Sequence, residues 1–531
     1  MNLNEEQQRA VDSNSELILC LAGAGAGKTR VAISRISRLV KDGVAPSSIL
    51  ALTFTNAAAA EMKERYARDH LGEELPEFRT FHAFCYSILC KDPAIREALG
   101  YANIPGIASE EQEKLISERA KAQCKITLSN DKLIHRDHLS RQEQFQAELY
   151  DKAVNKLMRS ENLITFDKLN HEVAELFANN HPATEVYKDK YKYIAADEFQ
   201  DTDAAQIKFL NSFTKSNFYF CGDCLQNIYS FRGTSNEFIK LLSTTDNWEK
   251  IKLFTNYRST NQICDYANKF SAKYADPSYR IEMKGTRDGE RVITKLVNGP
   301  KGYSAINPDD LDDVVHELTK LHGSSAILCR TNKEIAAVTA YLTSHDIDFI
   351  TSKEVRLQKL IDCALSDEYT LGLFASYLNS NKYGEYIRLS ATVKNPDLVW
   401  FLKLYGNVTQ IKEDMKIINK LRSIAGSFGS TNSKLDEVAE LLHLRSIKHA
   451  DKEYLGIEFL KYLKTVISEV KSSELYVGTI HSVKGLEYDN VFVMNVGSYC
   501  FRLDSEEHKN LFYVAITRAK NRLFVYELFN D

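Results

Sequence analysis

The amino-acid sequence predicts an α/β protein with two cores built on parallel sheets, each interrupted by a mainly helical insertion. Strand and helix patterns alternate in the first quarter of the chain, and strand patterns return after residue 193 and again over residues 466–531. Two long stretches, about 93–180 and 355–465, carry helical patterns instead. Such an alternation is typical of parallel sheets whose strands are joined by crossover helices.

The individual elements follow from local patterns. Residues 16–22 form a short apolar run that predicts a buried strand, and residues 28–41 place apolar side chains at helical spacing. Residues 48–55 predict a second buried strand, followed by helix formers over 56–65. Residues 284–307 are rich in glycine and proline and predict a loop. Further strands are expected at 193–197, 218–222, 252–255, 325–330, 476–480, 490–496 and 522–526.

Composition excludes several broad classes of protein. The chain has 531 residues, of which 44% are hydrophobic and 26% charged, which is ordinary globular usage. Its longest apolar runs fall far short of the roughly 18 residues of a membrane-spanning helix. The ten cysteines follow no spacing pattern and the N-terminus is polar, so we expect reduced thiols and a cytoplasmic protein. A net charge of −4 still allows a local nucleic-acid groove.

A glycine-rich turn between the first strand and the first long helix predicts a phosphate site. Glycines let backbone N–H groups converge on phosphate oxygens, and the helix N-terminus adds a favourable dipole. Lys28 is expected to reach the β- and γ-phosphates of ATP, and Thr29 to hold Mg²⁺. The first position of the usual P-loop pattern is Ala rather than Gly, and a merely tight turn is the alternative. The turn comprises Ala22, Gly23, Ala24, Gly25, Ala26, Gly27, Lys28 and Thr29.

A second candidate group lies at the end of the apolar run 193–197. Asp197 is a carboxylate at a strand end, which suits Mg²⁺ because this cation prefers oxygen ligands. Glu198 is then placed to orient or deprotonate an attacking water. Alone, such a pair is more often a solvated strand end. Together with the glycine-rich turn, it indicates a P-loop nucleoside triphosphatase.

Further motifs follow in a fixed order, and with them the chain resembles the UvrD/Rep/PcrA-type superfamily 1 helicases over residues 3–526. The motif segments are 3–7, 53–62, 80–82, 197–202, 222–233, 256–259, 327–332, 479–487 and 513–519. The resemblance implies two RecA-like domains with ATP between them. Their expected bounds are 1–85 and 155–250 for the first core, 86–154 for its insertion, 251–355 and 466–531 for the second core, and 356–465 for a short second insertion.

The resemblance also implies roles for residues around ATP. Arginines from the second core would neutralise charge on the departing phosphoryl group, and the adenine would lie between a ring and a guanidinium. The implied contacts are adenine recognition by Gln7, adenine stacking between Arg30 and Tyr257, a ribose contact by Glu487, γ-phosphate sensing by Gln226, and arginine fingers at Arg258 and Arg518.

Single-stranded DNA contacts are implied by the same resemblance. Bases stack on aromatic faces without regard to sequence, although core packing is the alternative for Phe54 and the preferred interpretation for Phe81. The implied contacts are Phe54, Asn56, His82, Tyr229, Phe231, Arg232 and His481. The chain departs from the family pattern at Ala57, at Lys509-Asn510 and at Phe231, and the first of these removes a cation expected to contact the DNA backbone.

Cys221 and Cys224 form a C-x-x-C pair that allows a zinc or redox site. No second pair lies nearby, and zinc usually needs four ligands, so inert thiols are expected.

These patterns predict an ATP-dependent single-stranded DNA translocase or helicase, with 3′→5′ polarity implied by the resemblance. A second hypothesis is a DNA-stimulated ATPase subunit that senses DNA ends and regulates a partner nuclease. Short UvrD-like chains of this kind resemble the helicase-like subunit of the bacterial Gabija antiphage system, which works beside an OLD-family nuclease. The loss of a cation at Ala57 and the short second insertion imply fewer contacts with DNA, which favours dependence on such a partner or on self-assembly.

Overall fold

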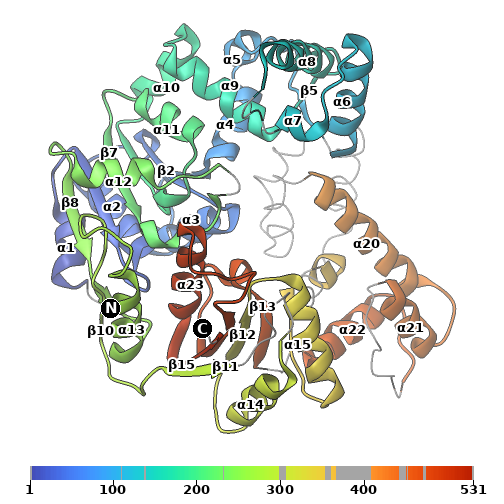
Figure 1. Cartoon of the computed structure of the whole chain (residues 1–531). Coiled ribbons are helices and arrows are strands. Elements are labelled where there is room, and N and C mark those ends of the chain that lie inside the picture. The colour runs from blue at the N-terminus through green and yellow to red at the C-terminus, as the bar shows by residue number, and fades with distance from the viewer. Residues whose placement is uncertain are drawn as a thin grey trace.

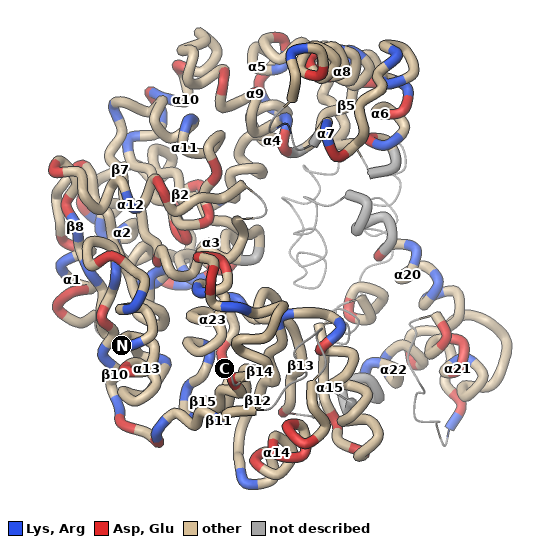
Figure 2. Tube along the Cα trace, viewed as in Figure 1, with Lys and Arg blue, Asp and Glu red and all other residues tan. Residues whose placement is uncertain are grey.

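The computed structural model describes residues 3–108, 110–134, 136, 139–230, 233–297, 306–352, 360–365, 408–441, 450, 452–470 and 474–528. Two parallel sheets lie in the two cores, and helical segments extend from each (Figure 1). Lysine and arginine are interspersed with aspartate and glutamate over both cores (Figure 2). Phe231, Arg232 and half of the expected second insertion lie outside the described residues. In the described part of the chain, no helix combines the length and the apolar character that crossing a membrane requires.

The first core contains a six-stranded sheet of order β3-β2-β6-β7-β1-β8, with every neighbouring pair parallel. Because the strands are parallel, all their carboxyl ends meet at one edge, where ligands bind in α/β sheets. The strands are β1 (Leu17–Ala22), β2 (Ile49–Thr53), β3 (Glu77–Thr80), β6 (Tyr193–Ala196), β7 (Asn217–Gly222) and β8 (Glu249–Leu253). The helices that precede or join them include α1 (Glu5–Asp12), α2 (Lys28–Lys41), α3 (Asn56–Asp69), α4 (Phe81–Lys91), α9 (Phe166–Ala178), α10 (Glu185–Lys190), α11 (Ala204–Asn211) and α12 (Glu237–Thr244).

Strand β8 differs from the expectation. A strand over 252–255 and a core boundary after residue 250 were expected, whereas β8 pairs with β1 in the first sheet and contains that boundary. The sequence of β8 is Glu-Lys-Ile-Lys-Leu, in which lysines alternate with apolar residues. An edge strand needs only one buried face, so β8 lacks the continuous apolar run that predicts a buried strand. The chain therefore leaves the first sheet only after residue 253.

The first insertion is mainly helical, as expected, but its ends lie inside helices. α4 crosses the expected boundary at 85/86, and α8 (Arg141–Ser160) crosses that at 154/155. Between them lie α5 (Pro93–Ala98), α6 (Glu110–Cys124) and α7 (Asn130–Ile134). The expectation of helices alone over 93–180 was wrong in one detail, because β4 (Gly106–Ile107) pairs with β5 (Leu163–Ile164). Two-residue strands are too short to produce a sequence pattern.

The second core contains a five-stranded sheet of order β11-β15-β14-β12-β13, again with parallel neighbours. The loop expected over 284–307 contains two strands, β10 (Lys284–Gly285), which pairs with β9 (Thr255–Asn256), and β11 (Ile293–Val297). The other strands are β12 (Ser325–Cys329), β13 (Leu475–Thr479), β14 (Tyr488–Val496) and β15 (Ala519–Leu528). The helices include α13 (Asn261–Ser271), α14 (Pro308–Leu318), α15 (Asn332–Ser344) and α23 (Glu506–Ile516). In the expected second insertion lie α20 (Val408–Gly426) and α21 (Thr431–Leu441), while α22 (Gly456–Val470) crosses the expected boundary at 465/466.

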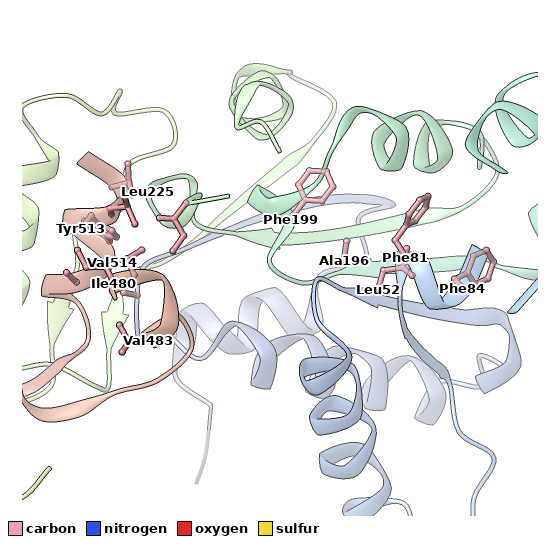
Figure 3. Packing of buried hydrophobic residues seen from close by; sticks show 14 of the residues in the cluster. Leu52, Phe81, Phe84, Ala196, Phe199, Leu225, Ile480, Val483, Tyr513 and Val514 are labelled. Carbon is pink, nitrogen blue, oxygen red and sulfur yellow. The ribbon is translucent and has the colours of Figure 1, made fainter. Parts of the chain in front are cut away.

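One hydrophobic cluster extends through both cores. It contains Phe81 and Phe84 of α4 together with Tyr513 and Val514 of α23, all nearly fully buried (Figure 3). Phe81 is 3% exposed and lies edge-on to Phe209, with ring centroids 4.9 Å apart. The interpretation of Phe81 as a core residue is confirmed. Phe54, on the same edge of the sheet, is only half-buried.

The contrast between these two phenylalanines gives a stability prediction. Phe81→Ala should lower the free energy of unfolding by about 3–5 kcal/mol, because it opens a cavity beside Phe209. Phe54→Ala should cost less than about 1.5 kcal/mol, because its ring already borders solvent. Chemical denaturation followed by tryptophan fluorescence compares the two variants. Equal losses would contradict the assignment of Phe81 alone to the core.

Candidate functional site

The glycine-rich turn has the backbone shape of a phosphate-binding loop. Gly25 and Gly27 have φ values of +69° and +79°, which side chains rarely tolerate. A Cβ atom at Gly25 would lie 2.6 Å from Asn256 Oδ1, so the loop has room only for glycine there. Gly27 directly precedes α2, whose first N–H groups lack intrahelical partners. This cradle therefore fits a polyphosphate. Ala22, Ala24 and Ala26 are buried around it, and Gly23 lies against Met283.

Lys28 is buried beside three carboxylates. It is 9% exposed, and Glu198, Asp223 and Asp197 raise its pKa against the lowering effect of burial. Thr29 Oγ1 donates a 2.6 Å hydrogen bond to Asp197 Oδ2, so the two residues expected to hold Mg²⁺ lie together. A hydroxyl beside a carboxylate is the donor set that this cation takes in P-loop enzymes.

Asp197, which is buried, and its half-buried neighbour Glu198 have opposite pKa shifts. Burial and the adjacent Glu198 raise the pKa of Asp197 to about 6. Burial also disfavours the charged form of Glu198, but Lys28 and Lys484 outweigh it and lower the pKa of Glu198 to about 2. A carboxylate kept ionised in this way can accept hydrogen bonds from a water molecule. Glu198 also has a left-handed backbone (φ +53°), a conformation that is strained for a residue other than glycine.

Gln226 and Arg518 connect the two cores behind this group. Gln226 Nε2 donates to Asp223 Oδ2 at 2.7 Å, and Arg518 Nη2 donates to Gln226 Oε1 at 3.4 Å. Arg518 is 1% exposed, and burial together with nearby Arg258 lowers its pKa to about 9. The structure thus brings the expected γ-phosphate sensor and one expected arginine finger into contact.

Arg258 and Glu487 form an ion pair with each other. Arg258 Nε donates to Glu487 Oε2 at 2.8 Å, and Arg258 Nη1 donates to the Thr517 carbonyl at 3.1 Å. Lys520 lies 3.1 Å from the other carboxylate oxygen of Glu487. Their expected contacts, to the γ-phosphate and to the ribose, remain predictions.

The expected adenine-binding residues lie around the same loop. Gln7 is buried, and its Nε2 donates to the Ala26 carbonyl at 2.9 Å, while its Oε1 accepts a hydrogen bond from the Asn4 backbone at 3.2 Å. Gln7 therefore supports the loop in addition to any contact with adenine. The Tyr257 ring is 44% exposed, and the Tyr257 N–H donates to the Gly25 carbonyl at 3.0 Å. Arg30 lies in the first turn of α2.

Two residues without an assigned role form a buried ion pair between the cores. Lys484 Nζ lies 2.5 Å from Asp201 Oδ2, donates to the Gln226 carbonyl at 2.9 Å, and lies 4.6 Å from the centroid of the Tyr229 ring. Burial raises the pKa of Asp201 to about 6 against the opposing pull of Lys484. Both residues belong to recognised motifs, but no spacing in the sequence pairs residues 283 positions apart.

A cavity of about 640 Å³ opens at the same edge of the first sheet and contains several of the expected DNA contacts. Asn56, which accepts a hydrogen bond from Thr80 Oγ1 at 3.1 Å, and His82 line it. Phe54 also lines it and stacks on Tyr229, with centroids 5.1 Å apart and ring planes 16° apart. Tyr229 lies 6.4 Å from the His481 ring, and burial lowers the pKa of His481. The cavity also reaches Asp197 and Glu198, so the candidate DNA site adjoins the candidate phosphate site.

Cys221 and Cys224 are buried free thiols, and burial raises the pKa of each. Within the described ranges, no group of three or more His, Cys, Asp or Glu side chains could hold a metal ion.

Comparison with known proteins assigns both halves of the chain to one family. Residues 3–247 match the UvrD/REP helicase N-terminal domain, and residues 251–365 and 376–528 match the UvrD-like helicase C-terminal domain. A probable DNA helicase II homolog of Mycoplasma capricolum is 28% identical, covering 98% of this chain and 84% of its own length. The ATP-dependent DNA helicases PcrA of Staphylococcus epidermidis and Staphylococcus aureus are 27% identical, covering 99% of this chain and 83% of theirs.

The ion pair between Asp201 and Lys484 gives a second stability prediction. Lys484→Met should cost about 3–5 kcal/mol of unfolding free energy, because it leaves a buried carboxylate without its partner. Adding Asp201→Asn should recover much of that loss, which a double-mutant cycle measures by chemical denaturation. Lys520→Met, which breaks the exposed pair with Glu487, is the matched control and should cost less than about 1 kcal/mol. Additive losses at residues 201 and 484 would show that the pair contributes no coupling.

Proposed function

The chain belongs to the UvrD-like helicase family, and on that basis we propose that it hydrolyses ATP to move along single-stranded DNA, as a translocase or helicase with 3′→5′ polarity. One observation supports this proposal above the others. Gln226, which donates to Asp223 near Lys28, and Tyr229, which stacks on the cavity residue Phe54, are three residues apart in one segment. A single backbone segment therefore contacts both candidate sites, as coupling of hydrolysis to movement requires.

The proposed hydrolysis divides roles among the residues at the sheet edge. Thr29 and Asp197 would hold Mg²⁺, which neutralises charge on the phosphates. Lys28 would stabilise the β- and γ-phosphate oxygens. Glu198, as a carboxylate, would accept hydrogen bonds from the attacking water and orient it towards the γ-phosphorus. The products are ADP, inorganic phosphate and a proton that leaves to solvent.

Closure of the second core completes the proposed site. Arg518 already lies beside Gln226 at 3.4 Å, whereas Arg258 would exchange Glu487 for phosphate oxygens. Both guanidiniums would then neutralise charge that develops on the departing phosphoryl group. Bases of the single strand would enter the cavity lined by Phe54 and His82 and stack on Tyr229.

The hydrolytic assignment is tested at residue 198. Glu198→Gln should retain ATP binding but lower the turnover number by about 10²–10⁴-fold, because it removes the carboxylate that orients water. Lys28→Ala should instead weaken ATP binding itself. A coupled phosphate-release assay with single-stranded DNA and Mg²⁺ measures turnover, and a fluorescent nucleotide measures binding. Wild-type turnover in Glu198→Gln would exclude the role given to this residue.

Strand separation distinguishes the helicase from the second hypothesis, the regulatory ATPase subunit beside a nuclease. We expect the isolated chain at low concentration to translocate on single strands yet to unwind weakly, since Ala57 replaces a cation of the family pattern and each lost phosphate contact weakens the grip. The substrates are duplexes with a 3′ or a 5′ single-stranded tail, in single-turnover conditions. Only the 3′-tailed duplex should be unwound. Efficient unwinding of long duplexes by a demonstrated monomer would overturn the dependence on a partner or on self-assembly.

A further inference from the structure

Helix α23 lies between Arg518, one of the two proposed arginine fingers, and the segment 224–230, which contains Tyr229. Its C-terminus leads directly to Thr517 and Arg518, and Arg518 contacts Gln226. Its N-terminal half contacts the segment 224–230 and α12, both in the first core. At about 1.5 Å per residue, the helix spans roughly 16 Å. A rigid rod of this length can transmit a displacement from one site to the other.

Asn510 forms the central contact of this helix with the first core. It is 2% exposed, and its Nδ2 donates to the Asn227 carbonyl at 3.0 Å and to the Cys224 carbonyl at 3.4 Å. The Asn227 carbonyl lies in the chain between Gln226 and Tyr229. The amide of Asn510 therefore contacts the backbone segment that joins the candidate phosphate sensor to the candidate base-stacking ring.

Neighbouring contacts hold the same surfaces together. Glu506 Oε1 accepts hydrogen bonds from Lys240 Nζ at 2.7 Å and from Asn236 Nδ2 at 3.2 Å. Glu507 Oε2 accepts a hydrogen bond from Ser230 Oγ at 3.0 Å. Leu225 belongs to the same hydrophobic cluster as Tyr513 and Val514 (Figure 3). These contacts hold the first turns of α23 against the first core at α12 and the segment 224–230.

The buried side-chain amide of Asn510 has an unsatisfied hydrogen-bond acceptor. Within the described chain its Oδ1 is buried and accepts no hydrogen bond, so this position costs stability that an apolar side chain would not cost. Asn510 is also a departure of this sequence from the basic lead-in that its family pattern carries. A costly polar group at an inter-core contact is explained if its two donated bonds serve the reaction.

We propose that Asn510 is a positioning residue, which links base stacking at Tyr229 to the placement of Arg518 by holding the Asn227 carbonyl against α23. The inference rests on the proposed function, since it concerns stimulation of ATP hydrolysis by single-stranded DNA. The hydrogen bonds that the structure describes for Asn510 go neither to the candidate ATP-binding side chains nor to the residues that line the cavity. Its loss should therefore affect communication between the sites more than either site alone.

The test uses the full chain with Asn510→Leu, which has the same branching with larger end groups and donates no hydrogen bond, and Asn510→Ser, which is too short to reach both carbonyls. Stimulation of the maximal ATPase rate by single-stranded DNA should fall by about tenfold or more. The KM for ATP, the DNA-free rate and the Kd for a labelled oligonucleotide should stay within about threefold of wild type. Lys509→Ala, next to it on α23, is the control and should keep full stimulation.

A double-mutant cycle with Tyr229→Ala separates transmission from a general structural effect. If Asn510 transmits the signal of Tyr229, the combined variant should lose no more stimulation than the more impaired single variant. Losses that multiply would overturn the inference, as would full stimulation in either Asn510 variant. A parallel fall in melting temperature, ATP affinity and DNA-free rate would also overturn it and assign Asn510 a structural role. If single-stranded DNA did not stimulate ATP hydrolysis by the wild-type protein, the result would instead contradict the proposed function.

Discussion

The burial of the Lys28 ammonium group is the constraint on which the first core depends. A buried charge without partners costs several kcal/mol, so Lys28 needs its carboxylates in place. Asp197 and Glu198 follow β6, and Asp223 follows β7. The strand order β6-β7-β1 sets the ends of these strands side by side. An order that moved β6 or β7 away from β1 would separate the cation from its partners, so the sheet topology and the candidate site stabilise one another.

The same charges tie the second core to the first. Lys484 and Arg518 enter from the second core, and both contribute to keeping Glu198 ionised. Lys484 neutralises Asp201, whose carboxylate would otherwise be buried alone. Movement of the second core would therefore change the electrostatic environment of Glu198. Opening and closing of the cores would act on the hydrolytic group directly.

Sequence patterns predicted the buried strands best. The strands expected at 193–197 and 218–222 correspond closely to β6 and β7, because strands covered on both faces are continuous apolar runs. β3, with the sequence Glu-Phe-Arg-Thr, is an edge strand, and no strand was expected there. The proximity of Thr29 to Asp197 agrees with the sequence analysis, which expected both residues to hold Mg²⁺, although it did not predict their hydrogen bond. The pairing of Arg258 with Glu487 could not be predicted, because it depends on how distant segments meet.

In the proposed DNA site, the stack of Phe54 on Tyr229 would set the energy scale of base binding. A base that takes the Phe54 position gains about 1–3 kcal/mol of stacking, but it first displaces a ring pair worth about 0.5–1.5 kcal/mol. Lys484, 4.6 Å from the Tyr229 ring, constrains that ring further. The net free energy gained per bound base is then small, because the stacking energy of the base and the energy of the displaced ring pair are similar in size. A motor that must release each base in every cycle needs this weak exchange, since a tightly held base would stall it. Processive grip must accordingly come from backbone phosphate contacts rather than from this pair of rings.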